Sequence, residues 1–134
     1  MGLNLRAVLF GVITAIVVGL ISGMSVPFTD NTLPAVGFGL TGLIAGLVAG
    51  YVAGGTVGNG ALNGGVATSL GTILVVVVLG LIGTALAGVF GLGVLVVGAV
   101  FVLIAAIPGA VGGAIGAWAK GERVTSPAGR PINR

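Results

Sequence analysis

The side chains that usually carry enzyme chemistry are nearly missing from this sequence. The chain of 134 residues has no His and no Cys, and its charged side chains are five Lys or Arg and two acids. Imidazole bases, thiolate nucleophiles and the common ligands of zinc, copper and haem are therefore excluded. The two acids, Asp30 and Glu122, do not form a pair within one segment. We predict no catalytic residue, no metal site and no cofactor, and hence no enzyme.

One glycine motif resembles a nucleotide-binding signature. Residues 37–42 match the dinucleotide fingerprint G-x-G-x-x-G, which works at a turn from a strand into a helix. No strand is expected before this motif, and residues 59–63 carry asparagines where an acid would be needed. Nucleic acid is also excluded as a partner, because the net charge of +3 comes with no basic face and no interleaved aromatic residues.

The composition instead indicates a membrane protein. Hydrophobic residues make up 57% of the chain and charged residues 5%, against about a quarter charged in an average soluble domain. Four apolar segments are long enough to cross a bilayer core of ~30 Å as helices. We therefore expect an all-α integral membrane protein with four transmembrane helices, which cover residues 5–24, 34–55, 66–87 and 92–119.

These helices are predicted to form one transmembrane domain, residues 1–119, followed by a basic, disordered cytoplasmic tail, residues 120–134. The connections are a polar segment that carries Asp30, a Gly- and Asn-rich loop over residues 56–65, and a tight turn over residues 88–93. The first apolar segment could instead be a cleaved signal peptide. It is longer than the usual apolar region of about 7 to 15 residues and no Ala-x-Ala site follows, so we favour a retained span.

Small residues recur at every fourth position in these segments, which predicts packing through glycine zippers. Residues four apart lie on one helical face, so missing side chains leave a groove in which a second helix approaches closely. In lipid, such close contact is one of the few forces that join helices. The predicted packing residues are Gly42, Gly46, Gly50 and Gly54 in the second segment, Gly11, Gly19 and Gly23 in the first, Gly80 in the third, and Gly109 and Gly113 in the fourth.

Other residues are expected to fix the helices in the bilayer. Pro108 is predicted to kink the fourth span, because it removes one helical hydrogen bond. Aromatic and basic side chains near the ends of the spans are predicted to be membrane-interface anchors: Tyr51, Trp118, Arg6, Lys120 and Arg123. All five basic residues lie toward the two chain ends, so the positive-inside rule places the protein in the cell membrane with both termini cytoplasmic.

A weak internal repeat accompanies these features. Residues 45–51 align with residues 112–118, and each of the two stretches ends in an aromatic residue. The first and third spans align better at a slightly different shift. Two tandem helical hairpins, which would be related by an axis along the membrane normal, therefore stay an open alternative to a single undivided bundle.

Three stretches resemble a family of small glycine-rich membrane proteins that is common in halophilic archaea and is known only as a domain of unknown function. They are residues 49–55, with the sequence AGYVAGG, residues 58–64, with glycines at both ends, and residues 107–116, with the sequence IPGAVGGAIG. The resemblance covers residues 1–119 and implies a four-span fold without supplying an activity. Many members end soon after the fourth helix, so the basic tail is a departure from the family pattern.

Two classes of function are compatible with these observations. The first is a structural or assembly component that acts through helix packing, with the lipid bilayer and either a second copy or another membrane protein as partners. The second is a small pore, a channel, a carrier or a holin-like permeabiliser. Apart from Arg6 at the start of the first, the apolar segments carry no charged residue, which weakens any ion-coupled transporter. We therefore expect the structural role.

Overall fold

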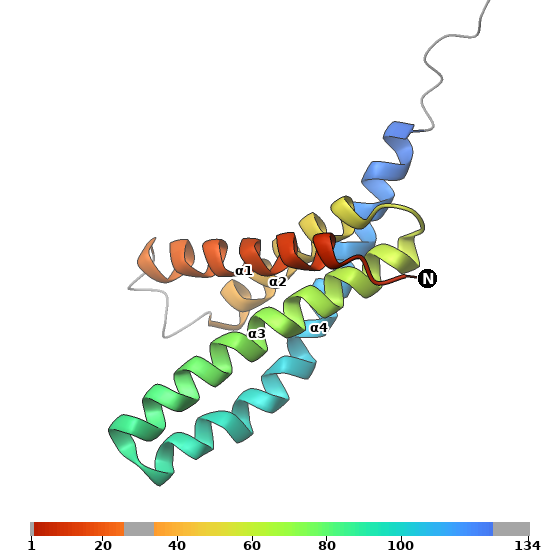
Figure 1. Cartoon of the computed structure of the whole chain (residues 1–134). Coiled ribbons are helices and arrows are strands. Elements are labelled where there is room, and N and C mark those ends of the chain that lie inside the picture. The colour runs from red at the N-terminus through yellow and green to blue at the C-terminus, as the bar shows by residue number, and fades with distance from the viewer. Residues whose placement is uncertain (1, 26–33, 125–134) are drawn as a thin grey trace, which may run out of the picture.

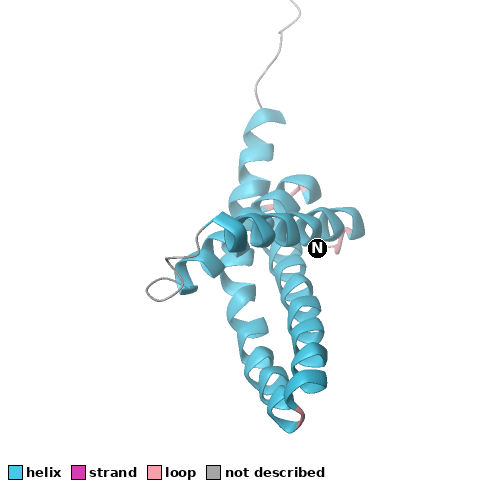
Figure 2. Cartoon of the chain, turned by 90° about the vertical axis from the view of Figure 1, so that its left-hand side faces the viewer, coloured by secondary structure: helices cyan, strands magenta, loops and turns pink. Residues whose placement is uncertain are grey.

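The computed structural model describes residues 2–25 and 34–124, and in these ranges the chain is folded into four α-helices without a strand (Figures 1 and 2). The expected all-α class is thus confirmed. The helices are α1 (Leu5–Ser25), α2 (Pro34–Ala53), α3 (Val57–Ala87) and α4 (Val89–Val124). The segment that carries Asp30 and the predicted tail beyond Val124 lie outside the described residues.

The four helices form a layered bundle around α2 and α3. α3 and α4 run antiparallel as a long hairpin, and α2 packs against both of them. α1 packs on α2 and α3 from the side opposite α4, and the described parts of α1 and α4 do not touch. Figure 1 shows α1 crossing the hairpin at an angle and the closed end of the hairpin extending past α1 and α2. One half of the hairpin is therefore covered by other helices and the other half is not.

α3 begins at Val57, so the prediction of a loop over residues 56–65 was wrong. The hydroxyl of Thr56 accepts a hydrogen bond from the backbone N–H of Asn59 at 3.2 Å, which caps the helix. Glycine and asparagine disfavour helices in water, where each interior Gly costs about 1 kcal/mol against Ala. Gly60 and Gly64 here contact the backbone of α4, and this tertiary packing outweighs the local preference.

The connection between α2 and α3 is correspondingly short. α2 ends at Ala53, and Gly54 and Gly55 have φ angles of 62° and 78°, which favour glycine. The N–H of Gly54 donates to the carbonyl of Gly50 at 2.9 Å. Gly54 therefore terminates α2. The sequence analysis had instead predicted that Gly54 extends the glycine ladder of this helix.

The turn between α3 and α4 is a single residue. Only Gly88, with φ of 60° and ψ of −131°, lies outside the two helices. The predicted turn over residues 88–93 and the predicted start of the fourth span at residue 92 were thus too far along the chain, because α4 begins at Val89. Pro108 lies inside α4, which Figures 1 and 2 show to bend along its length. That Pro108 causes this bend stays a prediction.

Two of the helices have the length and apolarity needed to cross a membrane. They cover Val57–Ala87 and Gly91–Gly121. The described apolar parts of the other two, Leu5–Ile21 and Gly39–Ala53, are shorter. The prediction of spans therefore finds support in the third and fourth segments, whereas the first and second spans stay predictions.

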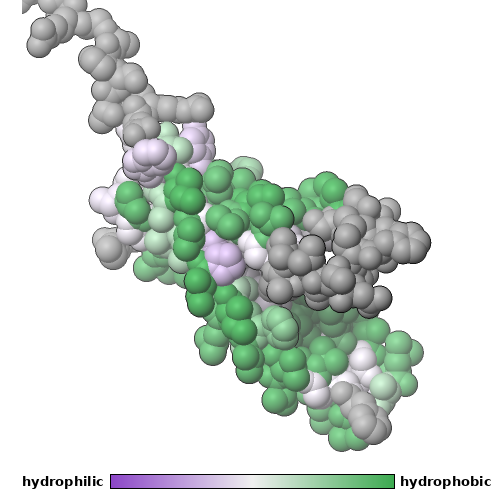
Figure 3. Space-filling view, turned by 180° about the vertical axis from the view of Figure 1, so that it is seen from behind, coloured by the Kyte–Doolittle hydropathy of each residue, from purple (hydrophilic) through white to green (hydrophobic). Residues whose placement is uncertain are grey.

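The interior of the bundle is made of small residues. The most deeply buried apolar side chains are, with the exception of Val8, alanines. They are Ala7, Ala45, Ala49, Ala67, Ala105 and Ala117. Large aliphatic side chains lie on the outside, and Figure 3 shows one such face, which is mostly apolar. The helices thus pack through small residues and expose large apolar side chains. A soluble bundle has the reverse arrangement, with large apolar side chains buried and polar ones exposed.

Candidate functional site

A very close helix contact joins α2 to α4 through four glycines. A Cβ atom added at Gly46 would lie 2.8 Å from Cα of Gly109, and one added at Gly50 would lie 2.6 Å from Cα of Gly113. Both added atoms would also overlap the carbonyl oxygen of the facing glycine. Real Cβ atoms do not approach other heavy atoms this closely. The pairing of 46 with 109 and 50 with 113 shows that α2 and α4 run parallel here.

The same two glycines of α4 also face α3. A Cβ added at Gly64 would lie 2.7 Å from Cα of Gly113, and one added at Gly113 would lie 2.9 Å from Cα of Gly64. Gly60 faces the carbonyl oxygen of Gly113, and Gly109 faces the carbonyl oxygen of Gly64 at 2.8 Å from the added atom. Gly109 and Gly113 therefore lie where α2, α3 and α4 meet. We call these six residues, Gly46, Gly50, Gly60, Gly64, Gly109 and Gly113, the glycine junction.

The contacts of the glycine junction are polar as well as steric. At several positions the nearest atom to the missing Cβ is a backbone carbonyl oxygen, so a glycine Cα–H occupies that direction and points at the oxygen. The relation is mutual for Gly60 and Gly113, each of which faces the carbonyl oxygen of the other. Such Cα–H···O contacts contribute about 0.5–1 kcal/mol each. An alanine at any of these positions would replace the contact with an overlap.

A second pair of glycines on α4 widens the contact with α2. A Cβ added at Gly112 would lie 3.0 Å from the backbone nitrogen of Leu47, and one added at Gly116 would lie 2.7 Å from the backbone nitrogen of Tyr51. The sequence analysis missed Gly112 and Gly116, together with Gly60 and Gly64. The signal for the first pair was present, since 112 and 116 repeat the four-residue spacing of 109 and 113 on the neighbouring face.

The other predicted packing glycines lie in varied surroundings. Gly42 faces Cγ of Pro108 at 3.2 Å from the added Cβ, and Gly80 faces Cγ of Leu95 at 2.7 Å. Gly11 of α1 lies between α3 and α2. A Cβ added at Gly11 would lie 2.6 Å from Cβ of Ala67 and 2.8 Å from Cβ of Ala49. A Cβ added at Gly19 would meet no atom within 4 Å. Gly23 lies in α1, but its surroundings are outside the described residues.

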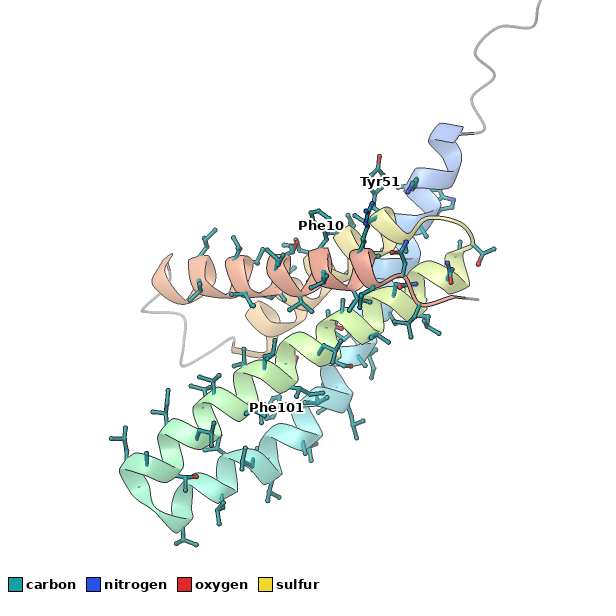
Figure 4. All side chains as sticks on the ribbon, viewed as in Figure 1. Phe10, Tyr51 and Phe101 are labelled. Atoms are coloured by element: carbon teal, nitrogen blue, oxygen red, sulfur yellow. The ribbon has the colours of Figure 1, made fainter. Side chains whose placement is uncertain are left out.

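Lys120 contacts the end of α2. Its Nζ donates a hydrogen bond to the carbonyl oxygen of Val52 at 3.2 Å and lies 5.8 Å from the centroid of the Tyr51 ring. A Cβ at Gly54 would lie 2.9 Å from this Nζ, so the missing side chain makes room for the lysine. A cation at the C-terminus of a helix is favoured by the helix dipole and by the free carbonyls. Figure 4 shows Tyr51 at this end of α2, beside the C-terminal part of α4.

The remaining predicted anchors lie on the surface where they are described. Trp118 on α4 is 56% exposed, and Arg6 at the start of α1 is exposed. The side chain of Arg123 lies outside the described residues. The sequence thus located Lys120 and Tyr51 at one end of the bundle but did not reveal that they contact each other.

Asn63 is a buried polar residue that the sequence analysis missed. It is 0% exposed, and its Oδ1 accepts a hydrogen bond from the N–H of Asn4 at 2.7 Å. Its Nδ2 donates to the carbonyls of Gly2 at 3.2 Å and Asn59 at 2.8 Å. Oδ1 of Asn59 accepts from the N–H of Gly2 at 2.9 Å. Two asparagines of α3 therefore hold the segment before α1 against the bundle.

The threonine hydroxyl groups within the described helices donate hydrogen bonds to backbone carbonyls of their own helices. Those of Thr14, Thr41, Thr72 and Thr84 each donate to the carbonyl four residues earlier, at 2.7 to 2.9 Å. This is the local role that Thr commonly has in apolar helices. Among the described residues no group of three or more His, Cys, Asp or Glu lies together.

The chain belongs to a family of unknown function, DUF5518, whose sequence profile matches residues 5–119. The matched region contains the whole glycine junction and ends next to Lys120. The match agrees with the expected membership of an uncharacterised family, whereas its occurrence in halophilic archaea and its membrane character stay expectations. No curated protein and no solved structure matches the chain.

Proposed function

We propose that this member of a family of unknown function is an integral membrane protein without catalytic activity, which acts as a structural or assembly component. The observation that carries the proposal is the glycine junction, where three helices meet in direct backbone contact through glycines. In lipid the burial of apolar side chains gives little driving force between helices, so close backbone contact is what holds a bundle together. The junction is suited to that solvent.

The outer surface supports lipid as the surrounding medium. Large aliphatic side chains of the α3–α4 hairpin are widely exposed, for example Leu86 at 83% and Leu103 at 74%. A soluble monomer rarely exposes contiguous apolar surface of this kind. Among the described residues, these two helices also have the length and apolarity needed to cross a bilayer.

The distribution of basic residues supports a topology with both ends of the chain on the cytoplasmic side. Gly2 contacts Asn59 near the start of α3, and Lys120 contacts Val52 near the end of α2. The short connection between α2 and α3 joins these two contacts, so Arg6 and Lys120 belong to the same end of the bundle. The positive-inside rule then assigns that end to the cytoplasm.

The hydroxyl groups favour the structural role over a pore, channel, carrier or holin-like permeabiliser. A water-filled path needs polar groups that face it, whereas the described threonine hydroxyls of α1, α2 and the hairpin donate to their own helices. A second copy of the chain, or another membrane protein, is the proposed partner. Gly19, Gly37 and Gly39 are among the glycines at which an added Cβ would meet no atom within 4 Å, and these three on α1 and α2 are the positions proposed to contact it.

The proposal is tested with purified protein in sealed liposomes that contain a self-quenching dye. We expect the dye to stay inside at all protein-to-lipid ratios, and we expect chemical cross-linking in the same liposomes to capture a defined oligomer. Gly19→Leu should reduce this cross-linking while it leaves the helix content unchanged. Dye release in proportion to the incorporated protein would overturn the structural role in favour of a pore.

A further inference from the structure

The closed end of the α3–α4 hairpin carries no polar surface. Between Ile73 and Ile104 the only polar side chain is Thr84, whose hydroxyl donates to the carbonyl of Gly80 at 2.7 Å. On either side of the turn Leu86 is 83% exposed and Val89 is 73% exposed. Figure 4 shows aliphatic side chains projecting from both helices around this end. A connection that emerged into water would ordinarily carry polar or charged residues.

The backbone of the turn is held by hydrogen bonds and by close contact between the two helices. The N–H of Gly88 donates to the carbonyl of Thr84 at 2.9 Å, and the N–H of Gly91 donates to the carbonyl of Gly88 at 3.0 Å. A Cβ added at Gly91 would overlap the backbone of Gly83 and Thr84, so the two helices are in backbone contact right up to the turn. The N–H groups of Gly88 and Gly91 are therefore bonded within the turn, which lowers the number of backbone groups that need another partner at membrane depth.

The length of the hairpin is compatible with a turn at the far edge of the hydrocarbon core. From the residue after Asn63, α3 continues to Ala87, and residues 64–87 cover ~36 Å at 1.5 Å per residue. A helix tilted by about 35°, within the range seen for membrane helices, would use ~30 Å of bilayer depth for this length, so the turn would lie at the far edge of the hydrocarbon core. Figure 1 shows that α1 crosses the hairpin at an angle, so the helices cannot all stand upright.

We propose that the turn at Ala87–Val89 is embedded in lipid: it contacts acyl chains at the far edge of the hydrocarbon core and forms no loop in water. The inference rests on the proposed membrane location. In this placement the end of the hairpin contacts acyl chains. No loop between α3 and α4 is then exposed on the far side of the membrane.

Single cysteines test this placement, because the native chain has none. Leu86→Cys and Val89→Cys are the two probes, Thr56→Cys in the exposed α2–α3 connection is the water control, and Leu103→Cys in the middle of the hairpin is the lipid control. Each protein is reconstituted in phosphatidylcholine vesicles and exposed to a charged maleimide on both faces. A second sample is labelled with an environment-sensitive dye before reconstitution and is quenched with lipids that carry a nitroxide on the acyl chain.

We expect labelling at position 56, loss of labelling at 86, 89 and 103, and acyl-chain quenching at 86, 89 and 103. Maleimide labelling at 86 and 89 would overturn the embedded turn even if 103 behaves as expected. Protection from maleimide without quenching by lipid at 86 and 89 would also overturn it, because another protein surface would then cover the turn. If 103 is labelled and unquenched as well, the membrane location itself fails, so the two failures are distinguishable.

Discussion

Gly50 of α2 lies against Gly113 of α4 so closely that a Cβ atom on Gly50 would be 2.6 Å from Cα of Gly113. Gly113 is in equally close contact with Gly64 of α3 on its other side. One position without a side chain thus fixes the approach of three helices.

The first prediction concerns the face of α2 that packs on α4. Gly50→Leu should force α2 away from α4 and destabilise the fold, because overpacking of this kind costs about 1–3 kcal/mol or more. Val48→Leu, two positions away on a half-buried part of α2, adds one methylene and should change stability little. Thermal unfolding in detergent, followed by circular dichroism, measures both. Equal tolerance at 48 and 50 would show that the glycine face is not a packing face.

The second prediction concerns the lysine that contacts the end of α2. Lys120→Met keeps most of the aliphatic stem but removes the bond to the Val52 carbonyl and the charge over Tyr51. The expected destabilisation is about 0.3–1 kcal/mol, the size of a charge–dipole interaction at a helix end. Arg6→Met removes the same charge from an exposed position and serves as the control. Equal changes in the free energy of unfolding of the two variants, measured by denaturant titration, would show that the contact of Lys120 with α2 adds no stability.

The third prediction concerns the buried amide of Asn63. Asn63→Ala removes the bonds to the N–H of Asn4 and the carbonyl of Gly2, and an intramolecular hydrogen bond of this kind contributes about 0.5–1.5 kcal/mol. Asn59→Ala removes a less buried partner of Gly2 and should cost less. Hydrogen exchange should become faster at the amide of Asn4 in the first variant. Unchanged exchange there would mean that Asn63 does not hold the segment before α1.

The fourth prediction is the topology. Single cysteines at Thr29, Thr56 and Ser126 are treated in intact cells with a thiol reagent that does not cross membranes. Only the cysteine at 29 should be labelled, because the positive-inside rule places 56 and 126 with the basic residues on the cytoplasmic side. Labelling at 126 but not at 29 would invert the topology, and labelling at both would contradict four spans.

The helices were predictable from the sequence because long apolar runs with small residues every four positions favour a helix over other secondary structures. The start of α3 was not predictable in the same way. Gly60 and Asn63 favour a loop in water, and only contact with Gly113 and with the segment before α1 makes a helix there favourable. The helical conformation at the start of α3 therefore depends on the residues that pack against it and not on its own residues alone.

The pairing of helices was partly predictable. The four-residue ladders predicted packing faces on α2 and α4 but no register between them, and the structure places Gly46 against Gly109 and Gly50 against Gly113. The spacing of small residues within each helix does not fix the register in which two helices touch. Gly54 shows the related limit, since a fourth glycine in a ladder can equally end the helix, as its φ of 62° does here.

The most direct test of the account compares two alanine substitutions on the same helix in lipid bicelles. Gly113 touches both α2 and α3, whereas a Cβ at Gly93 would meet nothing within 4 Å. Measured as the free energy of unfolding, Gly113→Ala should destabilise the protein by about 1–3 kcal/mol, as expected for overpacking. Gly93→Ala should leave stability unchanged or raise it by up to about 1 kcal/mol through helix propensity. Equal free energies for the two variants would contradict the claim that the glycine junction holds this bundle together.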